Sequence, residues 1–424
     1  MSKTTNVKNM YQSVVEQFDK AADLMKLDKG IRAILSLPQN EIVVHFPVKM
    51  DDGQIKVFKG YRVQHNNTLG PYKGGLRYHP AVEIETIKGL ASLMTWKTAL
   101  TALPFGGSKG GIQLDTSKYS ITEIERITRR FTFALGDNIG PDYDIPAPDV
   151  NTTSQMMAWM MDTYLSTKRP TERQDNIHIV TGKPIQSGGL LGRDASTGLG
   201  IVYTIDYWAK DNNVDLKKST YIVQGFGKAG YWASHFMNLR KATLLAVQDS
   251  SGTIFNSKGI DVEALYKYTK INNGLVAGFP QAQSIEPMDF FKVEVDIFIP
   301  AALGNQITEE TAPLLKVKLI AEGANGPTNL AGDKICLEKG ITLIPDILCN
   351  TGGVIGSYFE WLQNKTRESW ELEAVNNRLN IIMVKAYKEV VDTAKTYKTD
   401  WRTAAFIVAV SRIASVYKER GVFP

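Results

Sequence analysis

The sequence has little of what marks several classes of protein. Its 424 residues include only two cysteines, Cys336 and Cys349, so no disulfide framework is expected and a reducing compartment fits. Its 49 lysines and arginines exceed its 44 acidic residues by five, a balance too even to predict nucleic-acid binding. No apolar run approaches the roughly 18 residues of a membrane span, and the first ten residues have no apolar signal core. We therefore expect a cytoplasmic protein that binds neither nucleic acid nor membrane.

The five histidines are scattered without the spacing of metal ligands, so no metal site is predicted. What the chain does have is the composition of a globular protein, with 43% hydrophobic and 22% charged residues. Its length leaves room for two or three domains of about 150 residues each.

The hydrophobic pattern changes character near residue 181. After it, short apolar runs alternate with helical ones, and this rhythm predicts a mostly parallel sheet with helices on both faces. Before it, a β-hairpin around the turn signal at 51–53 accompanies four expected helices. The stretches 104–111 and 141–154 are rich in glycine or proline and are expected to be loops. The expected helices are 10–36, 83–98, 121–136 and 155–166.

A glycine-rich turn, GFGKAG, follows an expected strand and opens an expected helix, which is the context of a dinucleotide-binding fingerprint. Gly225 permits the tight turn around Phe226, Gly227 lets the backbone approach a pyrophosphate, and Gly230 allows close helix–strand packing. The alternative is a purely structural turn. Asp249 ends the next strand and is placed to bind a ribose 2′-hydroxyl, which favours NAD over NADP. Its own alternative is a turn-capping role ahead of Ser-Gly.

Three lysines of the N-terminal part are candidates for binding an anionic ligand. Lys73 and Lys109 have glycine neighbours that would let a small ligand approach, and Lys97 is expected near the end of a helix. Each alone would most often be a solvated surface charge. A lysine among other cations in a cleft, however, has a lowered pKa and can act as a base. Asp149 could supply a counterion and proton carrier, or could simply belong to the N-cap region of the following helix.

A series of short motifs, in a fixed order, spans nearly the whole chain. They are GPYKGGLRYHP, WKTAL, LPFGGSKGG, DIPAPDVNT, TGKPIQSGG, GRDASTG, VQGFGKAG, PAALGNQIT, EGANGPT, PDILCNTGGV and SYFEW. Together they resemble the glutamate, leucine, phenylalanine and valine dehydrogenase superfamily, and within it the hexameric glutamate dehydrogenases. One loop departs from the usual Tyr-Gly-Gly-Gly-Lys, because Ser108 places a β-carbon where glycine is usual.

The resemblance implies a role for each matching residue. Lys97 matches the lysine that holds the substrate α-carboxylate, and Lys109 matches the catalytic lysine of low pKa that activates water. Asp149 matches the aspartate that exchanges a proton with the amine. Lys73 and Ser357 match the residues that bind the γ-carboxylate. The implied site is completed by Gly74 and Gly75 beside the substrate, Thr197 and Asn350 around the nicotinamide, and Asn325 near its ribose.

The resemblance also implies a domain plan and a reaction. Residues 1–181 would form an α/β substrate-binding and oligomerisation domain, to which 393–424 return. Residues 182–392 would form a Rossmann-like dinucleotide-binding domain, with a cleft between the two. The expected reaction is the reversible oxidative deamination of L-glutamate to 2-oxoglutarate and ammonium, with hydride transfer to NAD or NADP, in a homo-hexamer.

Two alternatives stay open beside this expectation. A branched-chain or aromatic amino-acid dehydrogenase of the same superfamily would be expected to lack the lysine at position 73 and to have an apolar residue at position 357. A buried lysine without an anionic partner is costly, so the pocket expects a second carboxylate. A non-catalytic dinucleotide-binding regulatory subunit is the other alternative, and the presence of Lys109 and Asp149 argues against it.

Overall fold

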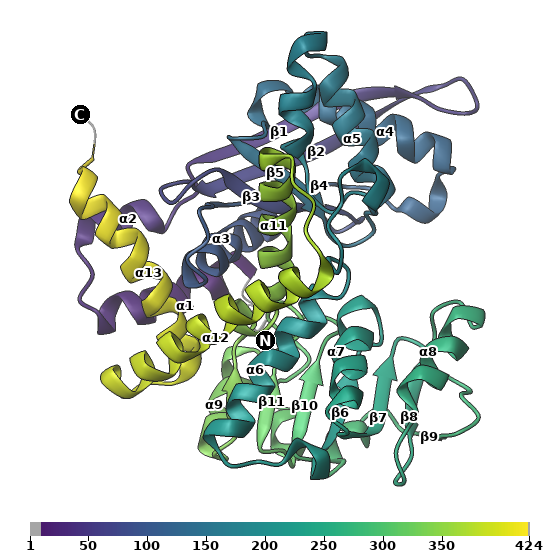
Figure 1. The fold of residues 1–424 in the computed structure, drawn as a ribbon, viewed down its shortest axis with the longest axis vertical. Helices are drawn as coiled ribbons and strands as arrows, with labels where there is room; N and C mark the ends of the chain where they lie inside the picture. The colour runs from purple at the N-terminus through teal and green to yellow at the C-terminus, as the bar shows by residue number, and fades with distance from the viewer. Residues whose placement is uncertain (1–9, 423–424) are drawn as a thin grey trace, which may run out of the picture. The chain divides into compact units, whose positions relative to one another are not determined.

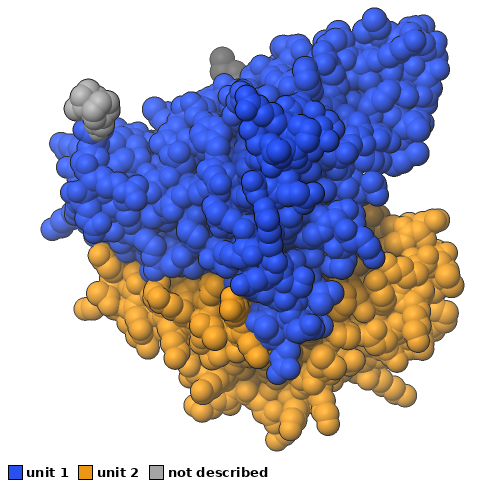
Figure 2. All heavy atoms as spheres, turned by 45° about the horizontal axis from the view of Figure 1, so that its top comes forward, with its two compact units in different colours: residues 1–193, 356–375, 406–424 blue, residues 194–355, 376–405 orange. Residues whose placement is uncertain are grey.

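The computed structural model describes residues 10–422, which fall into two compact units, coloured separately in Figure 2. The chain crosses from one unit to the other after residues 193, 355, 375 and 405. The sequence indicated one change of character near residue 181 and a C-terminal return; which part binds substrate and which binds dinucleotide stays a prediction. Unit 1 holds the residues up to 193, 356–375 and those from 406 onward, and unit 2 holds 194–355 and 376–405.

Unit 1 is built on a mixed five-stranded sheet in the order β1-β2-β4-β3-β5 (Figure 1). The antiparallel pairing of β1 with β2 across the Met50–Gln54 turn confirms the predicted hairpin. Strand β4 runs antiparallel to β2 and parallel to β3, and β5 runs parallel to β3. The strands are β1 (Asn40–Lys49), β2 (Ile55–Asn66), β3 (Tyr72–Tyr78), β4 (Gly107–Ile112) and β5 (Asp144–Pro148).

The stretches expected to be loops, 104–111 and 141–154, instead contain strands β4 and β5. Glycine makes β4 possible, because a β-carbon on Gly74 of the neighbouring strand would lie 1.5 Å from the Ser108 carbonyl oxygen. Strand β5 contains two prolines but lies at the sheet edge, where a missing N–H group is tolerated. Lys73 and Lys109, expected in loops, therefore lie on strands.

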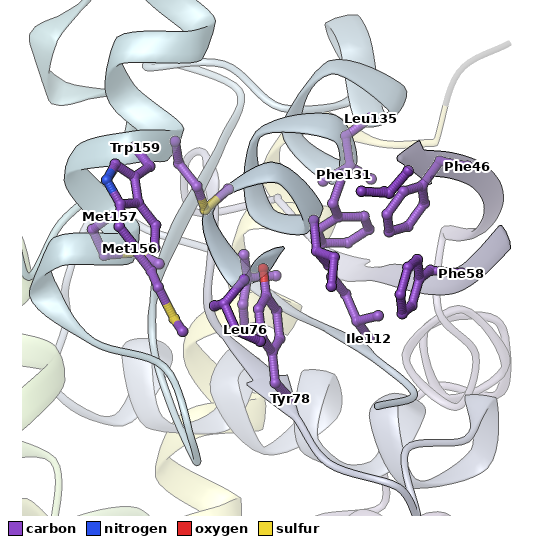
Figure 3. Packing of buried hydrophobic residues seen from close by; sticks show 14 of the residues in the cluster. Phe46, Phe58, Leu76, Tyr78, Ile112, Phe131, Leu135, Met156, Met157 and Trp159 are labelled. Atoms are coloured by element: carbon purple, nitrogen blue, oxygen red, sulfur yellow. The ribbon is translucent and has the colours of Figure 1, made fainter. Parts of the chain in front are cut away.

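Helices cover both faces of this sheet. Helices α4 and α5 bury one face, where Phe46 and Phe58 of the hairpin pack near Phe131 of α4 (Figure 3). Helix α3, which confirms the helix expected at 83–98, packs on the other face. The helix expected over 10–36 is two helices, because Asp28 caps a new one by accepting from two main-chain N–H groups. The helices are α1 (Met10–Leu24), α2 (Lys29–Leu35), α3 (Ile84–Leu100), α4 (Ile121–Leu135) and α5 (Ser154–Ser166).

Unit 2 contains a seven-stranded sheet in the order β12-β11-β10-β6-β7-β8-β9. Only β8 runs against the other strands, pairing antiparallel with β7 and with β9, so the predicted mostly parallel sheet is confirmed. The strand order reverses between β6 and β10, which is where open α/β sheets bind ligands beyond their carboxyl ends. The strands are β6 (Thr220–Gln224), β7 (Thr243–Asp249), β8 (Gly252–Phe255), β9 (Gln283–Ile285), β10 (Ile297–Pro300), β11 (Leu319–Ala321) and β12 (Thr342–Ile344).

Helices α6 and α7 lie together across one face of this sheet (Figure 1). A buried apolar cluster that includes Phe290, Phe298 and Cys336 packs against the same strands. Among the described residues, no helix combines the length and apolarity needed to cross a membrane. The remaining helices are α6 (Ser196–Asp211), α7 (Lys228–Leu239), α8 (Val262–Ile271), α9 (Leu330–Glu338), α10 (Asp346–Cys349), α11 (Gly352–Thr366), α12 (Leu372–Tyr397) and α13 (Trp401–Arg420).

Candidate functional site

The first group of candidate residues in unit 1 lies on one face of strand β3 and beside it. Side chains of a strand point alternately to opposite faces, so Lys73, Gly75 and Arg77 share the face opposite Leu76. Lys109 of β4 lies beside Gly75: a β-carbon there would stand 3.4 Å from the Lys109 Nζ atom. Glycine at position 75 thus leaves space for the lysine ammonium.

Lys109 is buried and ion-paired with Asp149, which follows β5. The Lys109 Nζ atom donates to Asp149 Oδ1 at 2.8 Å, and the Arg77 Nε atom donates to Asp149 Oδ2 at 2.8 Å. Burial lowers the pKa of Lys109 and the Arg77 charge lowers it further, while Asp149 opposes both. Burial also disfavours the Asp149 carboxylate, but Lys109 and Arg77 outweigh it and hold its pKa well below the ordinary value. The structure therefore brings together two residues that the sequence proposed as a proton-transfer pair.

Lys73 lies fully buried in a second cationic cluster of unit 1. Its Nζ atom donates to the Ile145 carbonyl oxygen at 3.2 Å. Burial lowers the pKa of Lys73 well below its ordinary value, and the charges of Arg193 and Arg62 lower it further, while Glu360 and Asp144 oppose this shift. Arg193 donates to the Ser357 hydroxyl oxygen from Nε at 3.2 Å and from Nη2 at 2.9 Å. Arg193 thus hydrogen-bonds Ser357 and acts electrostatically on Lys73, the two residues that the sequence proposed to bind one carboxylate.

A buried ion pair holds the helix that carries Ser357. Glu360, one turn later on α11, accepts from the Lys183 Nζ atom at 2.9 Å, and both side chains are fully buried. The same carboxylate accepts from the main-chain N–H groups of Gly182 and Lys183 at 2.8 and 3.2 Å. These contacts fix α11 against the 180–183 segment and so fix the direction of Ser357.

Ser108, the departure from the usual glycine, has a structural role in β4. Its hydroxyl donates to Asp144 at 2.8 Å and accepts from Arg62 at 2.7 Å, inside a fully buried ion pair. The added β-carbon therefore extends an ionic network. Lys97 is also buried, in the last turn of α3, the helix that packs against β4.

The glycine-rich turn of unit 2 has the shape that the fingerprint predicts. Gly225 adopts φ +89°, a conformation that favours glycine, and a β-carbon on it would lie 2.7 Å from Ala302. A β-carbon on Gly230 would lie 1.8 Å from the Gly225 oxygen. A β-carbon on Gly227, by contrast, would meet nothing within 4 Å, and Gly227 begins α7 without a side-chain cap. Open space at an uncapped helix N-terminus fits an anion such as pyrophosphate.

Asp249 serves its own loop. Its carboxylate accepts from the main-chain N–H groups of Ser251 and Val276 at 2.8 and 2.9 Å, and from the Ser251 hydroxyl. The turn-capping alternative is thus observed; a further bond to a ribose stays a prediction. The buried Phe226 packs edge-on against Tyr231 of α7.

The other cofactor candidates of unit 2 are two neighbouring asparagines, Asn325 and Asn350, and Thr197 of helix α6. The Asn350 Nδ2 atom donates to Asn325 Oδ1 at 3.2 Å and to the Ala324 carbonyl oxygen at 3.0 Å, so the structure brings the two asparagines together. Thr197 lies in the first turn of α6. Ser196, which precedes Thr197, has its carbonyl oxygen 2.1 Å from where a β-carbon on Gly352 would lie. The first turn of α6 therefore packs closely against the start of α11.

A buried network around Arg402, in the first turn of α13, supports these loops. Arg402 donates to both Glu322 oxygens at 2.7 and 2.9 Å and to Asp333 at 3.3 Å. The main-chain N–H of Asp346 donates to Glu322 at 2.8 Å, and Asp346 in turn accepts from the N–H of Gly326 at 2.9 Å. Burial raises the pKa of Glu322 despite the nearby Arg402. The network holds the loop after β11 and the short helix α10 in place.

Two family models match the chain. Residues 188–421 match the model described as Glutamate/Leucine/Phenylalanine/Valine dehydrogenase, and residues 38–166 match the Glu/Leu/Phe/Val dehydrogenase, dimerisation domain. The first match alone covers more than half of the sequence. The chain belongs to the Glu/Leu/Phe/Val dehydrogenase family. This confirms the resemblance read from the motifs.

Individual members of the Glu/Leu/Phe/Val dehydrogenase family resemble the chain over nearly all its length. The glutamate dehydrogenase of Thermotoga maritima is 44% identical over 418 residues, which cover 98% of this chain and 99% of that protein. The hetero-hexameric glutamate dehydrogenase from Thermus thermophilus, in its Leu-bound form, matches with a TM-score of 0.93 at 32% identity over all of both chains. The glutamate dehydrogenase from Peptoniphilus asaccharolyticus matches with a TM-score of 0.85 at 36% identity, covering 98% of this chain and 100% of that one.

In this member of the Glu/Leu/Phe/Val dehydrogenase family, sequence reasoning missed the arginines around the proposed site. Arg77 could have been found, because it shares the strand face of Lys73. Arg193 lies within one of the quoted motifs, but its contact with Ser357 is tertiary. Arg402 lies outside every motif and gave no signal. Among the described residues, no group of three or more His, Cys, Asp or Glu side chains is arranged to hold a metal ion.

Proposed function

We propose that the chain is an NAD(P)-dependent glutamate dehydrogenase, which reversibly deaminates L-glutamate to 2-oxoglutarate and ammonium. The observation that carries the proposal is the ion pair between the buried Lys109 of β4 and the partly buried Asp149 just after β5, in the same unit as the buried Lys73. Ionisable groups perturbed by burial and by specific partners are typical of catalytic sites. The names of the Thermotoga, Thermus and Peptoniphilus relatives agree with this activity.

The substrate class is inferred from the buried cations of unit 1, and above all from Lys73. A buried ammonium needs an anionic partner, and the two carboxylates that act on Lys73, those of Glu360 and Asp144, are already ion-paired with Lys183 and Arg62. A substrate with a second carboxylate supplies that partner, whereas the apolar side chain of leucine or phenylalanine does not. We assign the γ-carboxylate to Lys73 and Ser357, beside Gly74 and Gly75. Lys97 takes the α-carboxylate.

Lys109 and Asp149 handle the protons. Unprotonated Lys109 takes a proton from the water that attacks the substrate imine, and Asp149 exchanges a proton with the departing amine. Because the pKa of Asp149 is held low, its carboxylate is the resting form and carries a proton only in passing. Holding the groups in place supplies much of the rate enhancement of such a step.

The cofactor would be held by unit 2. A nicotinamide dinucleotide, when bound, accepts the hydride from the substrate α-carbon. The turn of Gly225, Phe226, Gly227 and Gly230 would hold the pyrophosphate, because only Gly227 faces open space there. Asp249 would favour the ribose of NAD over the phosphate of NADP. Thr197 and Asn350 would lie around the nicotinamide, and Asn325 near its ribose. We further propose a cytoplasmic homo-hexamer.

One assay tests the proposal. The purified protein is mixed with glutamate, leucine or phenylalanine and with NAD or NADP, and the absorbance of the reduced nicotinamide is followed. We expect turnover with glutamate, and faster turnover with NAD than with NADP. Turnover of leucine or phenylalanine in place of glutamate would identify the apolar type of family member. Dinucleotide binding by calorimetry without any turnover would identify a regulatory subunit instead.

A further inference from the structure

The Asp149 carboxylate is shared between two cations. Its Oδ1 atom lies 2.8 Å from the Lys109 Nζ atom, and its Oδ2 atom lies 2.8 Å from the Arg77 Nε atom. The three side chains come from three places in unit 1: Lys109 from β4, Arg77 from β3 and Asp149 from the end of β5. One carboxylate oxygen therefore faces each cation.

The main chain fixes this arrangement. The N–H of Asp149 donates to the Thr152 hydroxyl oxygen at 2.7 Å, and that hydroxyl donates to the Leu76 carbonyl oxygen at 2.9 Å. Asp149 is thereby tied to β3 one residue before Arg77. Gly75 completes the fit, because a β-carbon at this position would lie 2.9 Å from the Asp149 Cβ atom.

We propose that Arg77 is a positioning residue: it holds the Asp149 carboxylate against Lys109 and takes up part of its negative charge. Without Arg77, the whole carboxylate charge would act on Lys109 and keep it protonated. With Arg77, Lys109 keeps a neighbour for proton transfer yet gives up its own proton more readily. This role rests on the proposed function, in which Lys109 must be unprotonated to act.

The charged groups around Lys109 support the proposal that Arg77 compensates part of the Asp149 charge. Asp149 is the acidic group that acts on it, and Arg77 on β3 and Arg62 on β2 are the nearby cations. Lys97 lies on α3, the helix packed against β4. Arg62 is already bound to Asp144, so Arg77 is the cation placed to compensate Asp149. An arginine suits this task because its guanidinium stays charged throughout the working pH range.

The test is the pH dependence of kcat/KM for glutamate in Arg77→Met, Arg77→Gln and Arg77→Lys. The acid limb of this profile reports the group that must lose its proton. We expect the limb to move to higher pH in Arg77→Met and Arg77→Gln, because Lys109 then faces Asp149 alone. A limb displaced by one pH unit lowers kcat/KM about tenfold at a pH on that limb, and the loss is recovered at alkaline pH. Arg77→Lys keeps the charge and should keep the limb near its original position.

The matched control is Arg129→Met. Arg129 also pairs with carboxylates of unit 1, those of Glu125 and Asp162. It lies on helix α4, away from the residues proposed to carry out the reaction. Its loss should leave the limb in place. If Arg77→Met does not fold, Arg77→Gln and Arg77→Lys decide the matter. A limb that stays in place in the folded neutral variants, with activity reduced equally at every pH, overturns the proposal.

A second measurement separates this proposal from the proposed function. Cyanate carbamylates only unprotonated amines, so the pH midpoint of Lys109 carbamylation, followed by peptide mass spectrometry, reports its protonation without turnover. We expect this midpoint to rise in Arg77→Gln and to stay unchanged in Arg129→Met. If the parent protein does not oxidise glutamate but the midpoint rises, the function fails and the role of Arg77 stands. If turnover is present but the midpoint does not rise, Arg77 has no such role.

Discussion

Lys109 owes its chemical character to its surroundings in the fold. A lysine in water has an ordinary pKa far above neutrality, and burial with a neighbouring arginine is what lowers it here. We expect Lys109→Ala to lower kcat by about 10²- to 10⁴-fold, the usual contribution of a positioned base. Dinucleotide binding, measured by calorimetry, should persist because its turn is built from unit 2. The control is Lys118→Ala, which removes an exposed lysine. Normal turnover in Lys109→Ala would show that another group is the base.

Lys73 and Ser357 are the residues proposed to set the selectivity for glutamate over apolar amino acids. Removing one member of a buried charged contact costs about 2–5 kcal/mol, so Lys73→Leu with Ser357→Val should lower kcat/KM for glutamate at least about 30-fold. The ratio of kcat/KM for leucine to that for glutamate should rise. The rise should be moderate, because Arg193 keeps its charge beside the new apolar surface. Unchanged glutamate selectivity would show that other groups read the γ-carboxylate.

These residues also show how far the sequence could predict the site. The Gly225–Gly230 turn is a local motif, so its shape was predictable from residues adjacent in the chain. Lys73 and Lys109 were recognised, but their strands were expected to be loops, because glycine and proline normally interrupt strands. The sheet overrides that preference through pairing with distant segments. Arg193 was missed because its meaning depends on Ser357, a partner more than 160 residues away in the sequence.

Among the elements, the turn between β6 and α7 contains two glycines with different surroundings, Gly230 packed against the turn and Gly227 at the space proposed for the pyrophosphate. A β-carbon on Gly230 would meet the Gly225 oxygen at 1.8 Å, whereas one on Gly227 would meet nothing within 4 Å. We expect Gly230→Ala to lower the thermal unfolding temperature, because the helix must move away from the turn. Gly227→Ala should keep that temperature and weaken dinucleotide binding in calorimetry, because its methyl group occupies the space proposed for the pyrophosphate. Equal dinucleotide affinity in the parent and Gly227→Ala would place the pyrophosphate elsewhere.

At the scale of the whole molecule, we expect unit 2 to depend on the last segment that the chain contributes to it, residues 376–405. All seven strands of its sheet lie before residue 345, but the arginine that compensates its buried carboxylates arrives with α13, shortly before the chain leaves the unit after residue 405. Sequence patterning indicated a C-terminal helical stretch, but it could not indicate this contact. The role of a buried charge can be predicted only when its partner is known, and here Glu322 and its partner Arg402 are 80 residues apart in the sequence.

Arg402→Met tests that dependence. It leaves Glu322, Asp333 and Asp346 without their buried cation, and breaking a buried pair in this way costs about 3–5 kcal/mol. Hydrogen exchange should therefore rise in the strands of unit 2 and stay unchanged in those of unit 1, while Arg129→Met changes neither. The pKa of Glu322 is already raised by burial, and losing Arg402 raises it further above the unfolded value. The folded variant then binds more protons than the unfolded chain, so its deficit should be smaller at pH 5 than at pH 8. Equal protection of unit 2 in the parent and Arg402→Met at both pH values would show that its fold does not need this cation.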